Sequence, residues 1–332
     1  NTALTYLECQ VNELTSLDVS SNTALTYLNC SSNELTSLDV SANTALTYLD
    51  IESNQLTSLN VNNNTNLTEL RLNYNQLTSL DVSNNIALSK FEIYGSDLTS
   101  LDVSANTALT WLECGDNQLT SLDVSNNTAL YYLHCNSNQL TSLDVSDNTA
   151  LVYIHCQSNQ LNYLNMKNGV TALFEFNATN NSLTCIETLD PDYATANWTL
   201  ANGNIDDGVT FADICYASNP DYTNVPDDNF EQALIDLGYD DTLDDYVLTA
   251  NISGVTVLDV REKEISDLTG IEGFTALTTL DCQGNQLTSL DVSANTALTS
   301  LDCYSNQLTS LNVSANTALT ILHCNNNQLT SL

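Results

Sequence analysis

The amino-acid sequence predicts a repeat solenoid, built mainly from short parallel β-strands and turns, with one short helical cap near residues 226–238. Two observations carry this prediction: a period of 21 residues, and leucines that occupy the same places in each copy. Because a coil of this length cannot bury its leucines alone, the copies must stack into a continuous core. The motif Asn-Thr-Ala-Leu, or a close variant, begins at Asn1, Asn22, Asn43, Asn64, Asn85, Asn106, Asn127, Asn148, Asn295 and Asn316.

Each coil contains two apolar pairs with the spacing of a strand. Leu7 and Cys9 are two residues apart, and so are Leu17 and Val19, which places each pair on one side of an extended segment. The sequence therefore predicts two strand segments in each coil, joined by turns rich in Asn, Ser and Asp. Parallel ladders would stack the coils at a spacing of about 4.8 Å.

One asparagine in each coil falls inside a predicted turn. Its amide can bond the backbone of its own turn and that of the next coil, which would satisfy polar groups that the turn leaves unpaired. Ser96 interrupts this column beside Gly95, and we expect a local weak spot there rather than a site. The column comprises Asn12, Asn33, Asn54, Asn75, Asn117, Asn138, Asn159, Asn285, Asn306 and Asn327.

The pattern Leu-x-x-Leu-x-Cys-x-x-Asn-x-Leu-x-x-Leu-Asp-Val, first seen from Leu4 to Val19, resembles the leucine-rich-repeat family. Its 21-residue form is similar to the bacterial subclass called IRREKO repeats, which is common in secreted proteins of Bacteroidetes. A 22-residue coil that begins at Val255 is similar to internalin repeats. The resemblance covers about four-fifths of the chain. It implies an extracellular or cell-surface protein whose strand sheet is the usual binding face.

The period breaks near Asn168, and a new start signal follows in the middle of the chain. Two arrays in tandem are the simplest account, and a single continuous solenoid is the alternative. The expected divisions are a first array at 1–186, an irregular C-terminal cap at 187–220, a helical N-terminal cap at 221–254 and a truncated second array at 255–332.

Two features mark the caps. The segment from Val225 to Gly238 has proline near its start, acids in its first turn and glycine at its end, which predicts a helix. Its expected apolar stripe is Phe230, Ala233, Leu234 and Leu237. In an extracellular protein, Cys185 and Cys215, which flank the irregular cap, are candidates for a disulfide.

Charge excludes several classes of partner. The 41 acidic and 5 basic residues give a net charge of −36. Such a surface repels phosphate backbones and anionic membranes, so we expect neither nucleic acid nor a membrane surface as a partner. No apolar run approaches the roughly 20 residues that span a bilayer. No signal peptide is visible, but both ends fall in mid-repeat and look like cuts through a longer array.

Variation is concentrated on the outward positions of the first strand segment. The equivalent positions of the second segment hardly vary, as Ser16, Ser37 and Ser58 show. A varied face beside a monotonous one is expected of a recognition surface, and aromatic side chains suit a protein or glycan ligand. The alternative is that the tyrosines only stabilise the sheet. The candidate ligand-binding residues are Tyr6, Tyr27, Tyr48, Arg71, Lys90, Trp111, Tyr132 and Tyr153, with Glu113, His134 and His155 in the neighbouring column.

For the other polar columns we favour structural roles over functional ones. Arg71 and Lys90 would neutralise a stack of carboxylates, and His134 and His155 would pack as surface rings rather than bind zinc. The inward cysteines interchange with Ile and Leu, which is typical of small buried hydrophobic residues. The Asp column, which starts at Asp18, would bond its own turns; structural calcium is the less favoured alternative, and we expect no other cofactor.

No catalytic motif is present in the sequence, so we expect a binding protein and not an enzyme. The leading hypothesis is an extracellular recognition or adhesion module with a protein or glycan ligand on its strand face. The second is a structural segment of a long surface fibre or layer that contacts copies of itself.

Overall fold

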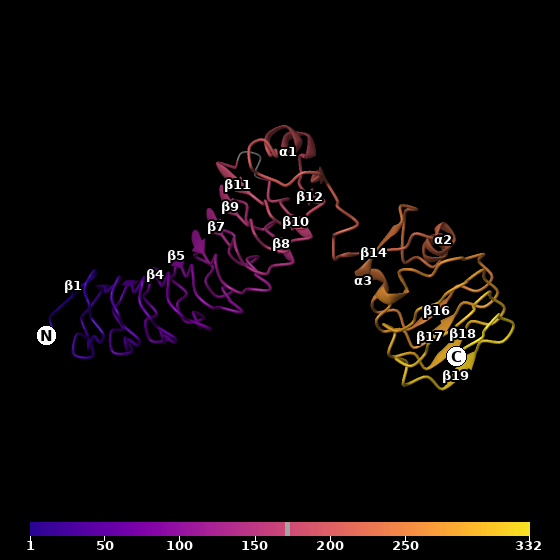
Figure 1. The fold of residues 1–332 in the computed structure, drawn as a ribbon, viewed down its shortest axis with the longest axis horizontal. Coiled ribbons are helices and arrows are strands. Elements are labelled where there is room, and N and C mark those ends of the chain that lie inside the picture. The colour runs from indigo at the N-terminus through magenta and orange to yellow at the C-terminus, as the bar shows by residue number, and fades with distance from the viewer. Residues whose placement is uncertain (170–172) are drawn as a thin grey trace. The chain divides into compact units, whose positions relative to one another are not determined.

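The structure, a computed structural model, describes residues 1–169 and 173–332. The chain is a parallel-strand β-solenoid of about 15 turns with few helices, so the predicted leucine-rich-repeat solenoid is confirmed. It divides into two compact units, Asn1–Cys215 and Tyr216–Leu332, and each is described by itself (Figure 1).

The first unit has a nine-stranded parallel sheet with one three-residue strand from each coil. Neighbouring strands pair one repeat apart, so Tyr6 lies opposite Tyr27 and Leu7 opposite Leu28. The middle residue of each strand points into the core, as Leu28 does, while both flanking side chains point outward. Along the sheet the strands are β1 (Tyr6–Glu8), β2 (Tyr27–Asn29), β3 (Tyr48–Asp50), β4 (Glu69–Arg71), β5 (Lys90–Glu92), β6 (Trp111–Glu113), β7 (Tyr132–His134), β9 (Tyr153–His155) and β11 (Glu175–Asn177).

The second segment of most coils is not a strand, which corrects the prediction of two strands in each coil. Leu38 and Val40 still point inward and are buried. A hollow lies between neighbouring segments at Ser79 and Ser100. Within the described part of the first unit, strands form at this position only near the C-terminal end, in the order β13 (Thr210–Ala212), β12 (Cys185–Glu187), β10 (Tyr163–Asn165) and β8 (Ser142–Asp144).

Turn asparagines connect each coil to its neighbour, as the sequence predicted. Asn33 Nδ2 donates to the carbonyl of Cys30 in its own coil and to that of Cys9 in the preceding coil, both at 3.0 Å. Its Oδ1 accepts from the backbone N–H of Leu14 at 3.0 Å. The side chain therefore replaces ladder bonds where the backbone turns.

A second asparagine column, that of the Asn-Thr-Ala-Leu motif, has a similar role that we did not predict. Asn43 is fully buried, and its Nδ2 donates to the carbonyls of Val19 and Asn22 at 3.0 and 2.9 Å. Where the first column is interrupted, Ser96 Oγ is buried without a hydrogen-bond partner. The interruption thus removes one of the connections between coils.

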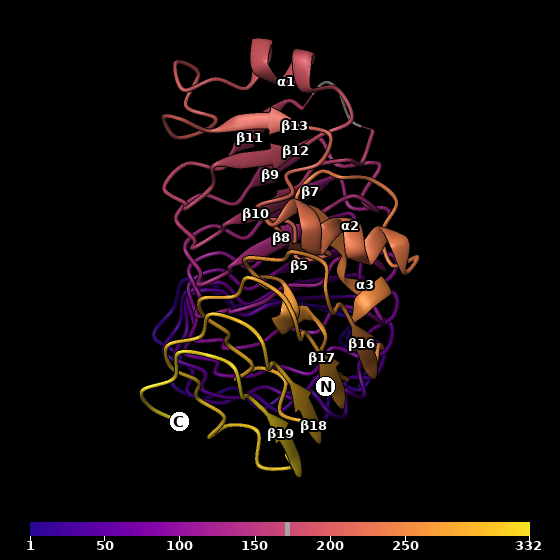
Figure 2. The ribbon, with the colours of Figure 1, turned by 90° about the vertical axis from the view of Figure 1, so that its right-hand side faces the viewer.

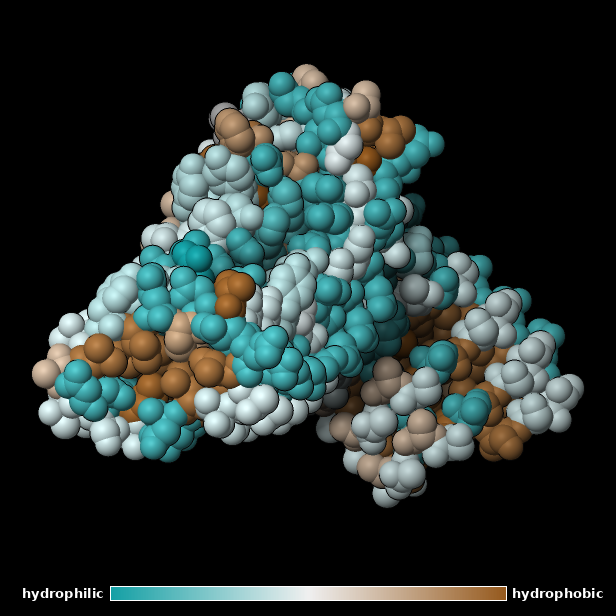
Figure 3. Space-filling view, turned by 60° about the vertical axis from the view of Figure 1, so that its left-hand side comes forward, coloured by the Kyte–Doolittle hydropathy of each residue, from teal (hydrophilic) through white to brown (hydrophobic). Residues whose placement is uncertain are grey.

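Stacked leucines form one continuous core in each unit. Leu49 and Leu70, for example, are fully buried, and burial of such a side chain contributes about 2 kcal/mol. Leu4 and Leu7 of the first coil are only partly buried. Figure 3 shows hydrophobic side chains in brown gathered at this end of the first unit, at lower left.

The stretch 187–220 contains a helix and a strand and is therefore more regular than the sequence suggested. Helix α1 (Pro191–Asn197) begins after Asp190, whose carboxylate caps the first turn. The helix packs against β13 (Figure 2). Trp198, at its end, is 4% exposed and lies 4.9 Å from Phe176, ring centre to ring centre. The apolar residues of this segment do not follow a helical period, so the sequence did not predict the helix.

Cys185 and Cys215 form a disulfide, with their Cα atoms 5.8 Å apart. The bond joins residues 30 positions apart and so encloses α1 and β13. Closing a loop of this size stabilises a fold by about 3 kcal/mol, mainly by restricting the unfolded chain.

The second unit contains the predicted helix, α2 (Asp228–Asp236), which Asp227 caps. Phe230, Ala233 and Leu234 are buried, but Leu237 is 44% exposed because it lies at the C-cap, off the stripe.

No helix in 1–169 or 173–332 combines the length and apolar character needed to cross a bilayer. The remaining elements are the antiparallel pair β14 (Tyr222–Asn224) and β15 (Tyr246–Leu248), α3 (Thr249–Ile252), the 3-10 turn η1 (Ile271–Gly273) and a parallel sheet of β16 (Val257–Asp259), β17 (Thr279–Asp281), β18 (Ser300–Asp302) and β19 (Ile321–His323).

Candidate functional site

The candidate ligand-binding residues share one face of the nine-stranded sheet. The first residues of the strands form one outward column, from Tyr6 to Glu175, and the third residues form another, from Glu8 to Asn177. The in-register pairing brings each side chain next to its counterpart in the neighbouring coil. We call this surface the strand face.

Stacked tyrosines occupy the N-terminal part of the strand face. The Tyr6 and Tyr27 ring centres are 4.2 Å apart, and those of Tyr27 and Tyr48 are 4.3 Å apart, with interplanar angles of 11° and 5°. The Tyr6 hydroxyl donates to Glu8 Oε1 at 2.7 Å. The in-register strands hold these rings as a flat strip with polar tips.

Two basic residues connect the aromatic groups across the middle of the strand face. The Arg71 guanidinium carbon lies 5.6 Å from the Tyr48 ring centre, and Lys90 Nζ lies 4.7 Å from that of Trp111. Both cations flank Glu92, with Lys90 Nζ at 2.7 Å and Arg71 Nε at 3.9 Å from its carboxylate oxygens. They neutralise this buried carboxylate and continue the row where β4 and β5 have no outward aromatic residue.

The C-terminal part of the strand face is again aromatic. Trp111 and Tyr132 stack with ring centres 3.5 Å apart and an interplanar angle of 5°. Tyr153 follows at 5.6 Å from Tyr132, in a tilted arrangement. In the neighbouring column the His134 and His155 rings are 4.0 Å apart. Aromatic side chains therefore occupy both ends of the strand face, and Arg71 and Lys90 occupy its middle.

Partial burial shifts the titration of polar groups in this part. Desolvation, followed by repulsion from Glu92, raises the pKa of Glu113, although Trp111 Nε1 donates to its Oε1 at 2.9 Å. Desolvation, followed by the adjacent His155, lowers the pKa of His134 to about 4. Consequently the His134 imidazole is neutral at physiological pH.

Two of the three histidines pair with a carboxylate, and the third, His134, contacts the Tyr132 hydroxyl. His155 Nε2 lies 3.0 Å from Glu175 Oε2, and His323 contacts Asp302. Across the described ranges, no three His, Cys, Asp or Glu side chains are grouped in a way that could hold a metal ion.

The Asp column bonds its own turns, which is the interpretation that the sequence favoured over calcium. Asp18 Oδ1 accepts from the backbone N–H of Ser20 at 2.9 Å, and hydrogen bonds from Ser20 lower the pKa of Asp18. The same bond to the serine two residues later recurs at Asp39, Asp81, Asp102, Asp123, Asp144 and Asp291.

The inward cysteines are core residues. Cys114 and Cys135 are fully buried, and desolvation raises the thiol pKa of both. A thiol in such surroundings is a poor nucleophile, because the thiolate is the reactive form. Only the cysteines of end coils, Cys9 and Cys324, are partly exposed among the free cysteines described.

A hollow at the edge of the strand face was missed by the sequence analysis. It has a volume of about 310 Å³ and lies among Tyr74, Tyr94, Glu113 and Gln157. Two signals in the sequence mark it: tyrosines at positions where other coils of the first unit have no aromatic residue, and a glycine one repeat after each, at Gly95 and Gly115.

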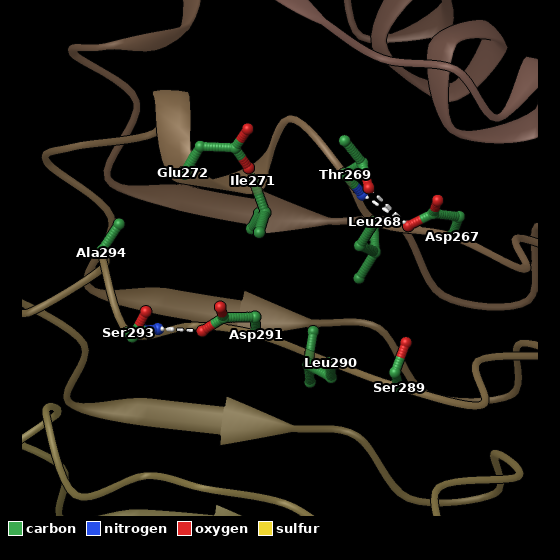
Figure 4. A pocket seen from close by; sticks show the side chains of 10 residues that line it. All are labelled: Asp267, Leu268, Thr269, Ile271, Glu272, Ser289, Leu290, Asp291, Ser293 and Ala294. Carbon is green, nitrogen blue, oxygen red and sulfur yellow. Dashed lines mark hydrogen bonds between the residues drawn. The ribbon is translucent and has the colours of Figure 1, made fainter.

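A second hollow lies in the second unit, beneath η1, and has a volume of about 350 Å³ (Figure 4). Its aspartates already accept hydrogen bonds from the local backbone. Asp267 accepts from the N–H of Thr269 and Asp291 from that of Ser293, both at 2.9 Å. Similar hollows recur between coils of the first unit. The feature therefore belongs to the repeat and carries no specific chemistry.

The fold and its repeated strand face define a leucine-rich-repeat solenoid. No protein-family model matches the chain. Internalin J of Listeria monocytogenes (serotype 4b, strain F2365) is 37% identical to it over 70 residues, which are 21% of this chain and 8% of that protein.

The solved structures that are similar to the chain include two from Listeria monocytogenes. The functional domain of InlJ from Listeria monocytogenes, described as including a cysteine ladder, is 32% identical with a TM-score of 0.54; the match covers 98% of this chain and 64% of that domain. Internalin InlF from Listeria monocytogenes is 22% identical with a TM-score of 0.51, over 96% of this chain and 86% of that one, and supports the fold alone. The chain thus spans less than two thirds of the InlJ domain and a small part of internalin J.

Proposed function

We propose that the chain is a recognition module that binds a protein ligand on the strand face of its first unit. The observation that carries this proposal is the row of stacked and partly exposed rings from Tyr6 to Tyr153. Such rings give large, rigid contact area at a small entropic cost, because each has only two side-chain torsions to restrict. The similarity to the functional domain of InlJ supports a binding role rather than a catalytic one.

A glycan is the second candidate ligand. Flat aromatic faces flanked by hydrogen-bonding groups also suit sugar rings, and the strand face offers both, as Trp111 beside Glu113 illustrates. The proposal of a protein ligand is preferred because the strip of rings extends over many coils and so matches an extended partner.

We further propose that the module works outside the cell or on its surface, and that its coils are of the IRREKO type found in secreted proteins of Bacteroidetes. The 21-residue register supports the repeat type. The Cys185–Cys215 disulfide supports an oxidising compartment. We propose likewise that the two capped arrays are separate parts of one surface protein.

The decisive experiment probes peptide and glycan arrays with the full chain and with a variant in which Tyr27, Tyr48, Trp111 and Tyr132 are replaced by Ala. We expect capture by the native chain and its loss in the variant. A matched control replaces Ser37, Ser58, Ser121 and Ser142, which lie on the monotonous second segments, by Ala. This control should retain capture.

Circular dichroism establishes that the fold is intact in both variants. If the aromatic variant binds as well as the native chain, the strand face is not the binding surface. If the native chain captures nothing and instead forms long particles under the electron microscope, the fibre hypothesis replaces this one.

A further inference from the structure

The hollow beside Tyr94 is built by two tyrosine–glycine pairs, each separated by one repeat. The Tyr74 ring lies over Gly95, where an added Cβ would come within 2.8 Å of its Cδ1. The Tyr94 ring lies over Gly115, where an added Cβ would come within 2.9 Å of its Cε2. The two rings meet edge to face with centres 5.6 Å apart. Because Gly95 and Gly115 have no side chain, the rings of Tyr74 and Tyr94 can each lie over the next coil and meet beside the hollow.

The rest of the lining is polar and also includes the amides of Asn73 and Asn136. Glu113 contributes a half-buried carboxylate, and Gln157 Oε1 is shielded from water without a hydrogen-bond donor. Burial lowers the pKa of His134, another lining residue, to about 4. Among the described residues, Glu113 makes no ion pair within 4.0 Å. No lysine or arginine lines the hollow, and Lys90, whose charge acts on Glu113, forms its ion pair with Glu92.

The chain itself shows what occupies such a combination of ring and carboxylate. Arg71 lies against Tyr48 and Glu92, and Lys90 lies against Trp111 and Glu92. The hollow repeats this pairing with Tyr94 and Glu113 but without a cation of its own. A net charge of −36 further favours a positively charged ligand.

We propose that the hollow between Tyr94 and Glu113 receives the guanidinium group of an arginine in an extended segment of the protein partner. This inference rests on the proposed function and specifies one anchor of the partner. The planar guanidinium stacks on the Tyr94 ring while its N–H groups donate to the Glu113 carboxylate. Arginine is preferred to lysine because a flat guanidinium can stack on a ring and present two N–H groups to one carboxylate at once. The volume of about 310 Å³ suits one such side chain.

The test uses the full chain and a short glycine–serine peptide that carries one arginine. Binding is followed by the backbone amide NMR signals of Gly95 and Gly115. We expect saturable shifts at these two glycines, and binding that is about tenfold weaker or worse when citrulline replaces arginine. Glu113→Gln and Tyr94→Leu should each weaken binding about tenfold. Glu8→Gln, the same change in the same column outside the hollow, should leave binding unchanged.

Several outcomes overturn the inference: no saturable shift, equal affinity for the citrulline peptide, or full affinity in Glu113→Gln. Shifts produced by N-acetylglucosamine but not by the arginine peptide would assign the hollow to a sugar. The proposed function is judged separately by array capture. If the four-residue aromatic variant loses capture while Glu113→Gln and Tyr94→Leu keep it, the hollow is dispensable and the strand face remains the binding surface. If the arginine peptide binds but the aromatic variant is captured on the array as well as the native chain is, the proposed function is the hypothesis that is refuted.

Discussion

The two units have sheets of the same construction that carry different outward side chains. In the first unit the leading column contains Tyr27, Tyr48 and Trp111, whereas in the second it contains Thr279 and Ser300. Strand length, parallel register and the buried middle leucine are the same in both. The comparison teaches that coil stacking does not depend on the outward residues. Those residues are therefore free to vary, and the aromatic ones are concentrated in the first unit.

The largest effect should come from the positions that the two units share. Leu112→Ala and Leu301→Ala each remove a fully buried side chain, and we expect each to destabilise its own unit by about 3 kcal/mol. Hydrogen exchange measured by mass spectrometry reads the local stability of each unit in the full chain. A cost below about 1 kcal/mol in only one unit would contradict the claim that both scaffolds are equivalent.

The next effect separates inner coils from end coils. Asn117→Ala removes a side chain that donates to the carbonyls of Ile93 and Gly115 and accepts from the N–H of Leu98. Because these groups are buried, we expect a loss of about 2 kcal/mol. Asn327→Ala, in a partly exposed end coil, should cost clearly less, since water can replace the lost bonds. Urea unfolding measures both, and equal losses would argue against burial as the cause.

A third prediction concerns pH and the first unit alone. The pKa of His134 is about 4 in the folded protein, below its ordinary value of about 6.5 in an unfolded chain. The unfolded chain therefore binds this proton first, and stability falls as pH decreases from about 6.5 to about 4. After allowance for solvent screening, we expect a loss of about 1–2 kcal/mol. His134→Gln should remove it, so a plot of melting temperature against pH should be flatter for the variant; parallel plots would refute the buried, neutral state of His134.

The smallest effect should come from transferring the aromatic column to the second unit. Thr279→Tyr with Ser300→Tyr places two rings on neighbouring strands that pair in register. We expect them to stack as Tyr27 and Tyr48 do and to stabilise the second unit by about 0.5–1 kcal/mol. Thermal unfolding gives the stability, and near-ultraviolet circular dichroism reports ring coupling. The double variant should not acquire the array ligand if the ligand needs the charges at Arg71 and Lys90.

Much of the scaffold could be predicted from the sequence because each coil repeats the same physical problem. Inward leucines, turn asparagines and the α2 boundary signals at Asp227 and Gly238 all act locally or at one fixed offset. Prediction failed where no repeat supplied a pattern. Helix α1 was missed, and Leu237 was assigned to a buried stripe although the helix ends before it.

The candidate site was predictable only in part. The columns of Tyr27 and His134 followed from register, and register follows from the period. The hollow did not, because Ser96 and Gly95 looked like a weak point in the stack. Their neighbours Tyr94 and Gly115 belong to different coils, and no periodic rule says how a ring will lean when a side chain in the next coil is absent.

The sequence by itself determined the coil, its period and the side of the sheet on which each residue lies, because a strand alternates its side chains and a solenoid places like positions next to one another. Only the tertiary structure decided which carboxylates are paired with a basic side chain, which histidine is neutral and where two rings leave a hollow. Those outcomes depend on distances of a few ångströms between coils and on exclusion of water, and neither quantity is written in the order of the residues.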